Sequence, residues 1–198
     1  MTPVESTSRR RWRATAALLL AAALLAVVAC TGGGQPSPSS PASEGPGGAP
    51  AGPVAPDFQL SLFETADYPA GQSLRLSDLE GRPVVLNFWF PSCPPCVAEM
   101  PDLEAAYQRY KDRVAFVGVQ LVGLDSVQDG QEFVRRMGVN YALGPDLRGD
   151  IVKEYEVVGF PTTVFLDSRL RVVRKWTGVL NLEKLEEIIE GELLGGSS

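Results

Sequence analysis

A short apolar run that breaks at two closely spaced cysteines constrains this 198-residue chain more than any other feature. Residues 84–90 read Val-Val-Leu-Asn-Phe-Trp-Phe, a run rich in β-branched and aromatic side chains that is typical of a strand buried on both faces. Pro91 and Ser92 end the run, and Cys93-Pro94-Pro95-Cys96 follows. Apolar residues then recur at helical spacing through residues 97–107. The sequence therefore predicts a strand, a tight turn carrying two cysteines, and a helix.

The two cysteines are predicted to form a redox pair. Proline fits the first turn of a helix, where its missing N–H has no internal partner, so Pro94 and Pro95 place Cys93 at the helix N-terminus. The partial positive charge and the unpaired N–H groups there favour a thiolate, which makes Cys93 the expected exposed nucleophile. Cys96, one turn further on, is the expected resolving cysteine, and the pair would react through a mixed disulfide.

A structural disulfide and half of a metal site are the alternatives for this pair. A disulfide across two residues closes too small a loop to contribute much chain-entropy stabilisation. A zinc site usually takes four Cys, His or carboxylate ligands, whereas this chain has no histidine and only one other cysteine. We therefore expect no metal, and no cofactor other than a redox-active disulfide between Cys93 and Cys96.

Several motifs together carry a resemblance to a known family. The sequence has Phe88-Trp89 before the cysteine pair, Glu99-Met100-Pro101 after it, and Gly159-Phe160-Pro161-Thr162-Thr163 far downstream. In this order they resemble the thioredoxin superfamily, and within it the extracytoplasmic TlpA/ResA branch, over residues 54–194. The resemblance implies a thioredoxin fold, an α/β fold with a central mixed β-sheet flanked by helices, with a TlpA/ResA-like αβ insertion and an N-terminal extension.

The resemblance also implies a substrate site. In thioredoxin-like proteins the proline that matches Pro161 is cis and lies beside the cysteine pair. The backbone before it, here that of Phe160, pairs with an extended substrate segment by strand addition. We expect Trp89 to contribute to the same site.

Two further positions bear on proton transfer. Asn87 stands where thioredoxin has a buried aspartate that titrates, and asparagine cannot do so. Glu99 lies three residues after Cys96 on an adjacent face of the helix, and it matches a glutamate that TlpA/ResA-like proteins hold near their cysteines. We expect Glu99 to tune or deprotonate the pair; a solvated helix glutamate is the alternative.

The chain departs from the family at the turn itself. Ser92 stands where thioredoxin-like sites usually have tryptophan, and the Pro94-Pro95 pair removes two backbone donors that would face the Cys93 sulfur. These departures predict a less stabilised thiolate than in a site with one proline between the cysteines.

The N-terminal residues predict export and a lipid anchor. Four arginines between positions 9 and 13 precede the apolar residues 14–29, as in an export signal, and the run is too short and too rich in alanine to favour a permanent membrane helix. Val27-Val28-Ala29-Cys30 resembles the lipobox of bacterial lipoproteins, so we expect residues 1–29 to be a signal peptide and Cys30 to be lipidated. A plain secretory signal is the alternative, and the arginines leave the Sec and twin-arginine routes open.

Residues 30–53 are expected to form a disordered tether, because after Cys30 they are almost entirely Gly, Pro, Ser and Ala. Residues 54–198 suit one domain, in which strand and helix signals alternate. Beyond Cys30 the chain has 14 Lys and Arg against 23 Asp and Glu, a net charge of −9. This acidic balance argues against nucleic acid as a partner.

These patterns predict a lipid-anchored thiol–disulfide oxidoreductase on the extracytoplasmic face of a bacterial cell membrane. The resemblance implies that it reduces protein disulfides, for example in apocytochrome c, with electrons from a membrane thiol donor. An oxidase that introduces disulfides into exported proteins is the alternative, because the motifs do not fix the direction. A non-catalytic binding lipoprotein of the same fold is the alternative from another class. A peroxidase of the peroxiredoxin type is disfavoured, since Phe90 stands where that site requires Thr or Ser.

Overall fold

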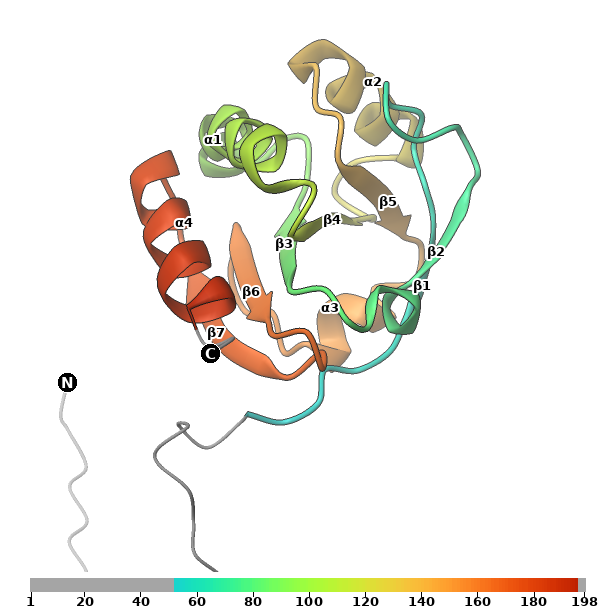
Figure 1. Ribbon diagram of the computed structural model, residues 1–198. Helices are drawn as coiled ribbons and strands as arrows, with labels where there is room; N and C mark the ends of the chain where they lie inside the picture. Colours follow the sequence, from blue (N-terminus) through green and yellow to red (C-terminus); the bar gives the residue numbers. More distant parts are fainter. Residues whose placement is uncertain (1–51, 196–198) are drawn as a thin grey trace, which may run out of the picture. The chain divides into compact units, whose positions relative to one another are not determined.

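A central sheet of five strands organises residues 52–195, the part of the chain that the computed structural model describes (Figure 1). The signal peptide, Cys30 and most of the tether predicted for residues 1–53 lie outside these residues. The strands lie in the order β5-β4-β3-β6-β7. Their bounds are β3 Val84–Trp89, β4 Ala115–Leu121, β5 Ala142–Asp146, β6 Thr162–Leu166 and β7 Val172–Thr177.

The strand directions make the sheet mixed. β3 runs parallel to β4 and β4 parallel to β5, whereas β6 is antiparallel to both β3 and β7. All six residues of β3 are buried, as the apolar run predicted. The carboxyl ends of β3, β4 and β5 therefore meet at one edge of the sheet, and the two cysteines follow β3 at that edge.

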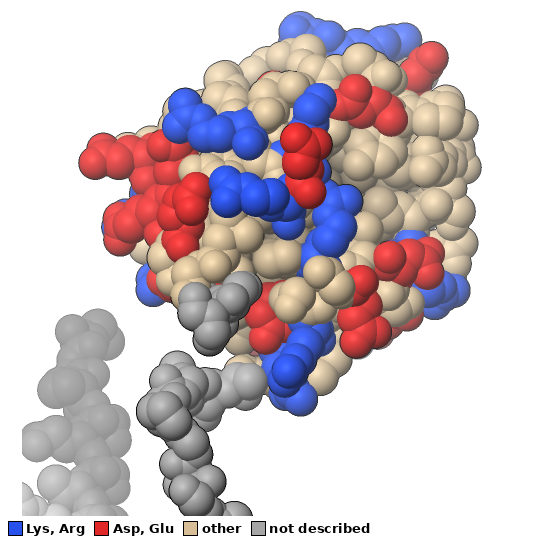
Figure 2. All heavy atoms as spheres, viewed as in Figure 1, with Lys and Arg blue, Asp and Glu red and all other residues tan. Residues whose placement is uncertain are grey.

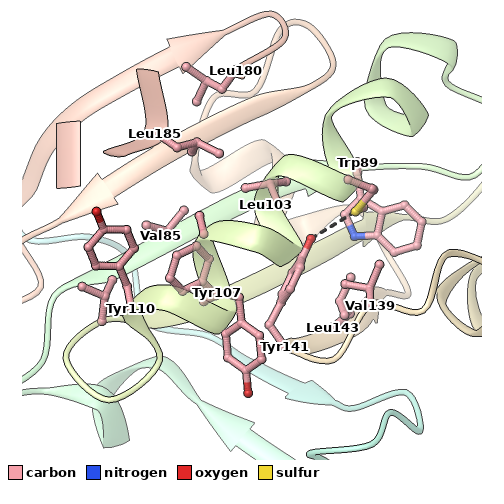
Figure 3. Close-up of a cluster of buried hydrophobic side chains, with 14 of the residues drawn as sticks. Val85, Trp89, Leu103, Tyr107, Tyr110, Val139, Tyr141, Leu143, Leu180 and Leu185 are labelled. Atoms are coloured by element: carbon pink, nitrogen blue, oxygen red, sulfur yellow. Dashed lines mark hydrogen bonds between the residues drawn. The ribbon is translucent and has the colours of Figure 1, made fainter. Parts of the chain in front are cut away.

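Two hydrophobic clusters cover the two faces of the sheet. α1 (Pro94–Tyr110), α2 (Val127–Met137) and α4 (Leu182–Ile188) contribute to the cluster drawn in Figure 3. The other face packs against α3 (Asp150–Glu154), the short 3-10 helix η1 (Leu76–Leu79) and the two-stranded sheet of β1 (Gln59–Ser61) and β2 (Ser73–Arg75). Successive side chains of β3 point to opposite faces, so Val85 and Trp89 join the first cluster and Val84, Leu86 and Phe88 the second.

The helix termini follow local sequence signals. α1 has prolines at its first two positions and runs through Pro101 to Tyr110. α2 begins with a capping box of Ser126 and Asp129 and ends at Gly138, which adopts a left-handed conformation. The Asn181 side chain caps α4 by accepting a hydrogen bond from the Lys184 N–H at 2.9 Å.

The αβ insertion that the resemblance implied is present as β5 and α3, after α2. A π-helical segment, η2 (Ile189–Leu194), continues α4 and was not predicted. On the face seen in Figure 2, Lys and Arg side chains lie among Asp and Glu side chains. Within residues 52–195, no helix has both the length and the apolar character needed to cross a bilayer.

The chain enters the sheet at the end that lies opposite the cysteines. The Pro53 carbonyl accepts a hydrogen bond from the Val172 N–H at 2.9 Å, and the Leu170 carbonyl accepts one from the Ala55 N–H at 2.8 Å. Val172 is the first residue of β7 and pairs with Leu166, the last residue of β6. β3 therefore runs from the sheet end where Pro53 and Val172 meet to the cysteine pair. Its 6 residues, at about 3.3 Å each, separate the two places.

Candidate active site

Cys93 and Cys96 form a disulfide at the start of α1. Cys93 is the N-cap residue of the helix, and its Sγ accepts a hydrogen bond from the Cys96 N–H at 3.2 Å. Pro94 and Pro95 occupy the first turn, where they cost no internal hydrogen bond. The predicted place of both cysteines is confirmed, and the helix N-terminus directs its partial positive charge at the Cys93 sulfur.

The exposure expected for Cys93 is wrong for this oxidised form. Cys93 is 3 % exposed and Cys96 is fully buried, whereas Pro94 and Pro95 beside them are exposed. The cause is the disulfide itself, which ties the Cys93 sulfur to a partner in the core. Reduction has to break this bond before Cys93 can act as a nucleophile.

The Phe160–Pro161 peptide bond is cis, as the resemblance implied. Phe88 of β3 pairs with Thr162 of β6, and this antiparallel register brings Phe160 next to Phe90. The rings of Phe90 and Phe160 meet edge to face with centroids 5.2 Å apart, and Phe160 is half-buried. The Pro161 carbonyl accepts a hydrogen bond from the Gly178 N–H at 2.9 Å. The cis-proline segment thus lies at the cysteine edge of the sheet.

The expected contact of Trp89 with substrate is wrong. Trp89 is fully buried on the α1 face of the sheet, where its ring stacks on that of Phe133 with centroids 5.0 Å apart. In Figure 3 it lies beside the hydrogen bond that the Tyr141 hydroxyl donates to the Met100 Sδ at 3.1 Å. Because β3 side chains alternate and this position points into the core, Trp89 packs the site from beneath and does not reach its surface.

Glu99 is a buried carboxylate within a hydrogen-bond network. It has no exposed surface, so the alternative of a solvated helix glutamate is wrong. The Asn87 Nδ2 donates to Glu99 Oε1 at 2.7 Å and to Thr163 Oγ1 at 3.0 Å, and the Leu180 N–H donates to Glu99 Oε2 at 3.1 Å. Burial raises the pKa of Glu99 to about 7, because desolvation outweighs the two hydrogen bonds that favour the carboxylate.

The network contains partners that the sequence analysis did not single out. Thr163 pairs with Asn87 across β6 and β3, and its place in the Gly159–Thr163 motif was the available signal. Leu180 acts through its backbone N–H, for which side-chain chemistry gives no signal. Asp125 lies in the loop before α2 and accepts hydrogen bonds from Ser92. A contact between residues 33 positions apart is not visible in the sequence.

The arrangement provides what thiol–disulfide exchange requires. It combines two cysteines that bond to each other, a helix N-terminus at the first of them, and a buried acid on the same helix with a pKa near neutrality. In the part of the chain that the structure describes, no group of three or more His, Cys, Asp and Glu side chains is placed to hold a metal ion.

Comparisons with known proteins agree with this chemistry. Residues 51–175 match the model of the AhpC/TSA family. The thiol-disulfide oxidoreductase ResA of Oceanobacillus iheyensis is 36% identical over 137 residues, which cover 68% of this chain and 69% of ResA.

Solved structures are similar as well. A putative thiol:disulfide interchange protein DsbE from Chlorobium tepidum has a TM-score of 0.63 at 28% identity, covering 71% of this chain and 96% of that one. The exposed lipoprotein thioredoxin Etrx1 of Streptococcus pneumoniae has a TM-score of 0.60 at 25% identity, covering 69% and 99%.

Proposed function

Because this chain belongs to the AhpC/TSA family and is a thiol–disulfide oxidoreductase of the ResA and DsbE type with a thioredoxin-like fold, we propose that it reduces disulfides in exported proteins. The observation that carries the proposal is the Cys93–Cys96 disulfide at the N-terminus of α1, with the buried Glu99 on the same helix. The electrons reside in the dithiol, so these steps require no bound cofactor.

The reaction proceeds in two exchanges. The Cys93 thiolate attacks one sulfur of the substrate disulfide, which forms a mixed disulfide and releases the other substrate sulfur as a thiolate. The Cys96 thiolate then attacks the Cys93 sulfur, which forms the Cys93–Cys96 disulfide and releases the second substrate thiol. Two electrons pass to the substrate, and a membrane thiol donor restores the dithiol by the same exchange in reverse.

Glu99 supplies the proton acceptor for the second exchange. Cys96 is buried, and burial in apolar surroundings disfavours its thiolate, so its attack requires a base. A carboxyl with a pKa of about 7 both accepts and returns a proton near neutral pH. Asn87 is a positioning residue in this scheme, because its amide holds one carboxylate oxygen of Glu99 in place.

The substrate binds by strand addition beside the cis-proline. Phe160 lies two residues before β6 begins, at the cysteine edge of the sheet. An extended substrate segment that pairs there would bring its sulfur to Cys93. Apocytochrome c, with closely spaced cysteines in its haem-binding segment, is the substrate we propose.

The anchor places this reaction at the membrane. We propose that Cys30 carries the lipid, on the basis of its lipobox-like sequence and of the similarity to an exposed lipoprotein thioredoxin. Pro53, the last residue of the proposed tether, accepts a hydrogen bond from the Val172 N–H at the end of the sheet opposite Cys93.

The reduction potential of the Cys93–Cys96 couple tests the direction. We expect equilibration with a thiol buffer to give a value near or below that of thioredoxin, about −270 mV. A value near about −120 mV would overturn the reductase and favour a thiol oxidase acting on exported proteins. An intact domain that does not reduce insulin, with no change on Cys93→Ala, would reject both and leave the non-catalytic binding protein.

A further inference from the structure

A carboxylate from another part of the chain lies beside the residue that precedes Cys93. The Asp125 Oδ2 accepts hydrogen bonds from the Ser92 N–H at 3.1 Å and from the Ser92 hydroxyl at 2.8 Å. Asp125 belongs to the loop between β4 and α2. The loop therefore brings a negative charge to the turn that carries the disulfide.

Two helices begin next to this carboxylate. Cys93 is the N-cap residue of α1, and Ser126, which follows Asp125, is the N-cap residue of α2. The positive end of a helix dipole stabilises a nearby anion, and the Asp125 carboxylate lies beside both of these termini. A thiolate on Cys93 would have to share the positive end of α1 with that carboxylate.

The remaining charges near the turn do not offset Asp125. In residues 52–195, no Lys or Arg forms an ion pair or a hydrogen bond with it. Glu99 on α1 is buried in its own network, and Asp129 on α2 belongs to the cap of that helix. Of the other loops at the cysteine edge, residues 157–161 and 178–180 contain no charged residue. The loop after β5, residues 147–149, contains Arg148, which forms an ion pair with Asp150.

The Ser92 contact also removes a hydrogen-bond donor. Its N–H points at Asp125, and Pro94 and Pro95 have no N–H to offer. Among the residues that the structure describes, the Cys96 N–H is the one donor to the Cys93 sulfur.

We propose that Asp125 is a tuning residue of the redox site, whose charge destabilises the Cys93 thiolate and so makes the couple a stronger reductant. This inference rests on the proposed role of Cys93 as the attacking thiol. A like charge disfavours ionisation, and a less stable thiolate weakens the reduced form relative to the disulfide. Ser92 lies between Asp125 and Cys93, so we expect the charge of Asp125 to raise the pKa of Cys93 by about 0.5–1 unit. This corresponds to about a three- to tenfold change in the ratio of thiolate to thiol.

The pKa of Cys93 tests the proposal directly. Residues 31–198 contain both core clusters and every hydrogen bond of the site, and with Cys96→Ser they keep Cys93 as the single cysteine. The pH dependence of the rate of alkylation by iodoacetamide then reports the thiolate. Asp125→Asn keeps an oxygen that accepts from Ser92 and removes the charge, so we expect it to lower the pKa of Cys93 by about 0.5–1 unit. A change below about 0.2 unit would overturn the proposal.

Two controls separate this contact from a general effect of charge. Asp129→Asn removes one carboxylate from the first turn of α2, and we expect it to lower the pKa of Cys93 by less than half as much as Asp125→Asn does. A shift equal to that of Asp125→Asn would overturn the proposal. Ser92→Ala removes the hydroxyl contact and keeps the charge, so we expect Cys93 to titrate within about 0.2 unit of its reference. Should Asp125→Asn fail to fold, Asp125→Ser carries the same expectation. The alkylation rate tests the role of Asp125 without any catalytic turnover. Failure of the chain with both cysteines to reduce insulin would count against the proposed function and not against the role of Asp125.

Discussion

Replacing Glu99 with glutamine should change how the stability of the domain depends on pH. Burial raises the pKa of Glu99 from 4.5 to about 7. Below pH 4.5 Glu99 is protonated in both the folded and the unfolded chain, so its burial does not lower the free energy of unfolding through ionisation. Between the two values the unfolded chain releases the proton and the folded chain keeps it, so the free energy of unfolding falls as the pH rises. Above the pKa of Glu99 in the folded chain, the free energy of unfolding has fallen by the full amount.

The shift sets the size of the effect. Each pKa unit corresponds to about 1.36 kcal/mol, so the ionisation of Glu99 should remove about 3 kcal/mol of stability between about pH 4 and about pH 8. Glu99→Gln abolishes this titration. The glutamine side chain has one accepting oxygen where Glu99 has two, so one of the donors from Asn87 and Leu180 faces its NH2 group. This lowers the free energy of unfolding by an amount that does not vary with pH.

Urea unfolding of the oxidised protein at a series of pH values measures the difference between variant and wild type. The free energy of unfolding of Glu99→Gln minus that of wild type should rise by about 3 kcal/mol across the window. Glu183→Gln, at an exposed position of α4, controls for the loss of one carboxylate. A difference that stays flat or falls with pH would refute the argument that Glu99 is held in a desolvated site.

Three further substitutions test the surroundings of the site. Trp89→Phe should cost about 1–2 kcal/mol in urea unfolding and leave the KM for insulin unchanged, because Trp89 packs in the core and its indole N–H has no partner among the described residues. Gly130→Ala should cost about 1–3 kcal/mol by the same measurement, because a Cβ there would lie 2.1 Å from the Oε1 of Gln120. Asn87→Ala removes a donor that lowers the pKa of Glu99, so an infrared titration should find that carboxyl ionising at higher pH than in wild type.

The sequence predicted the local structure of this domain well because its signals are local. The apolar run at residues 84–90 became β3, and the two prolines set the start of α1. The mixed sheet and the cis bond at Pro161 came from the resemblance and not from periodicity, since the base rate for cis X-Pro is only about 5–6%.

The errors concern which way a side chain points and what lies against it. Trp89 was expected to contribute to the substrate site, but the alternation of β3 sends its side chain into the core. Cys93 was expected to be exposed, and the disulfide buries it. The contacts of Asp125 with Ser92 and of Leu180 with Glu99 depend on how separate loops meet, which no local pattern encodes.

The distribution of hydrogen-bond donors in the site explains why we favour a reductant. Two donors, the Asn87 amide and the Leu180 N–H, converge on the carboxylate of Glu99 and keep a buried acid able to ionise near neutral pH. The Cys93 sulfur receives one, from Cys96, among the described residues. Each donor to a sulfur favours the thiolate and hence the reduced protein, which is how an oxidising member of such a couple is made. A site with more hydrogen-bond donors to its proton acceptor than to its thiolate stabilises the reduced form less. This favours the transfer of electrons to a substrate disulfide.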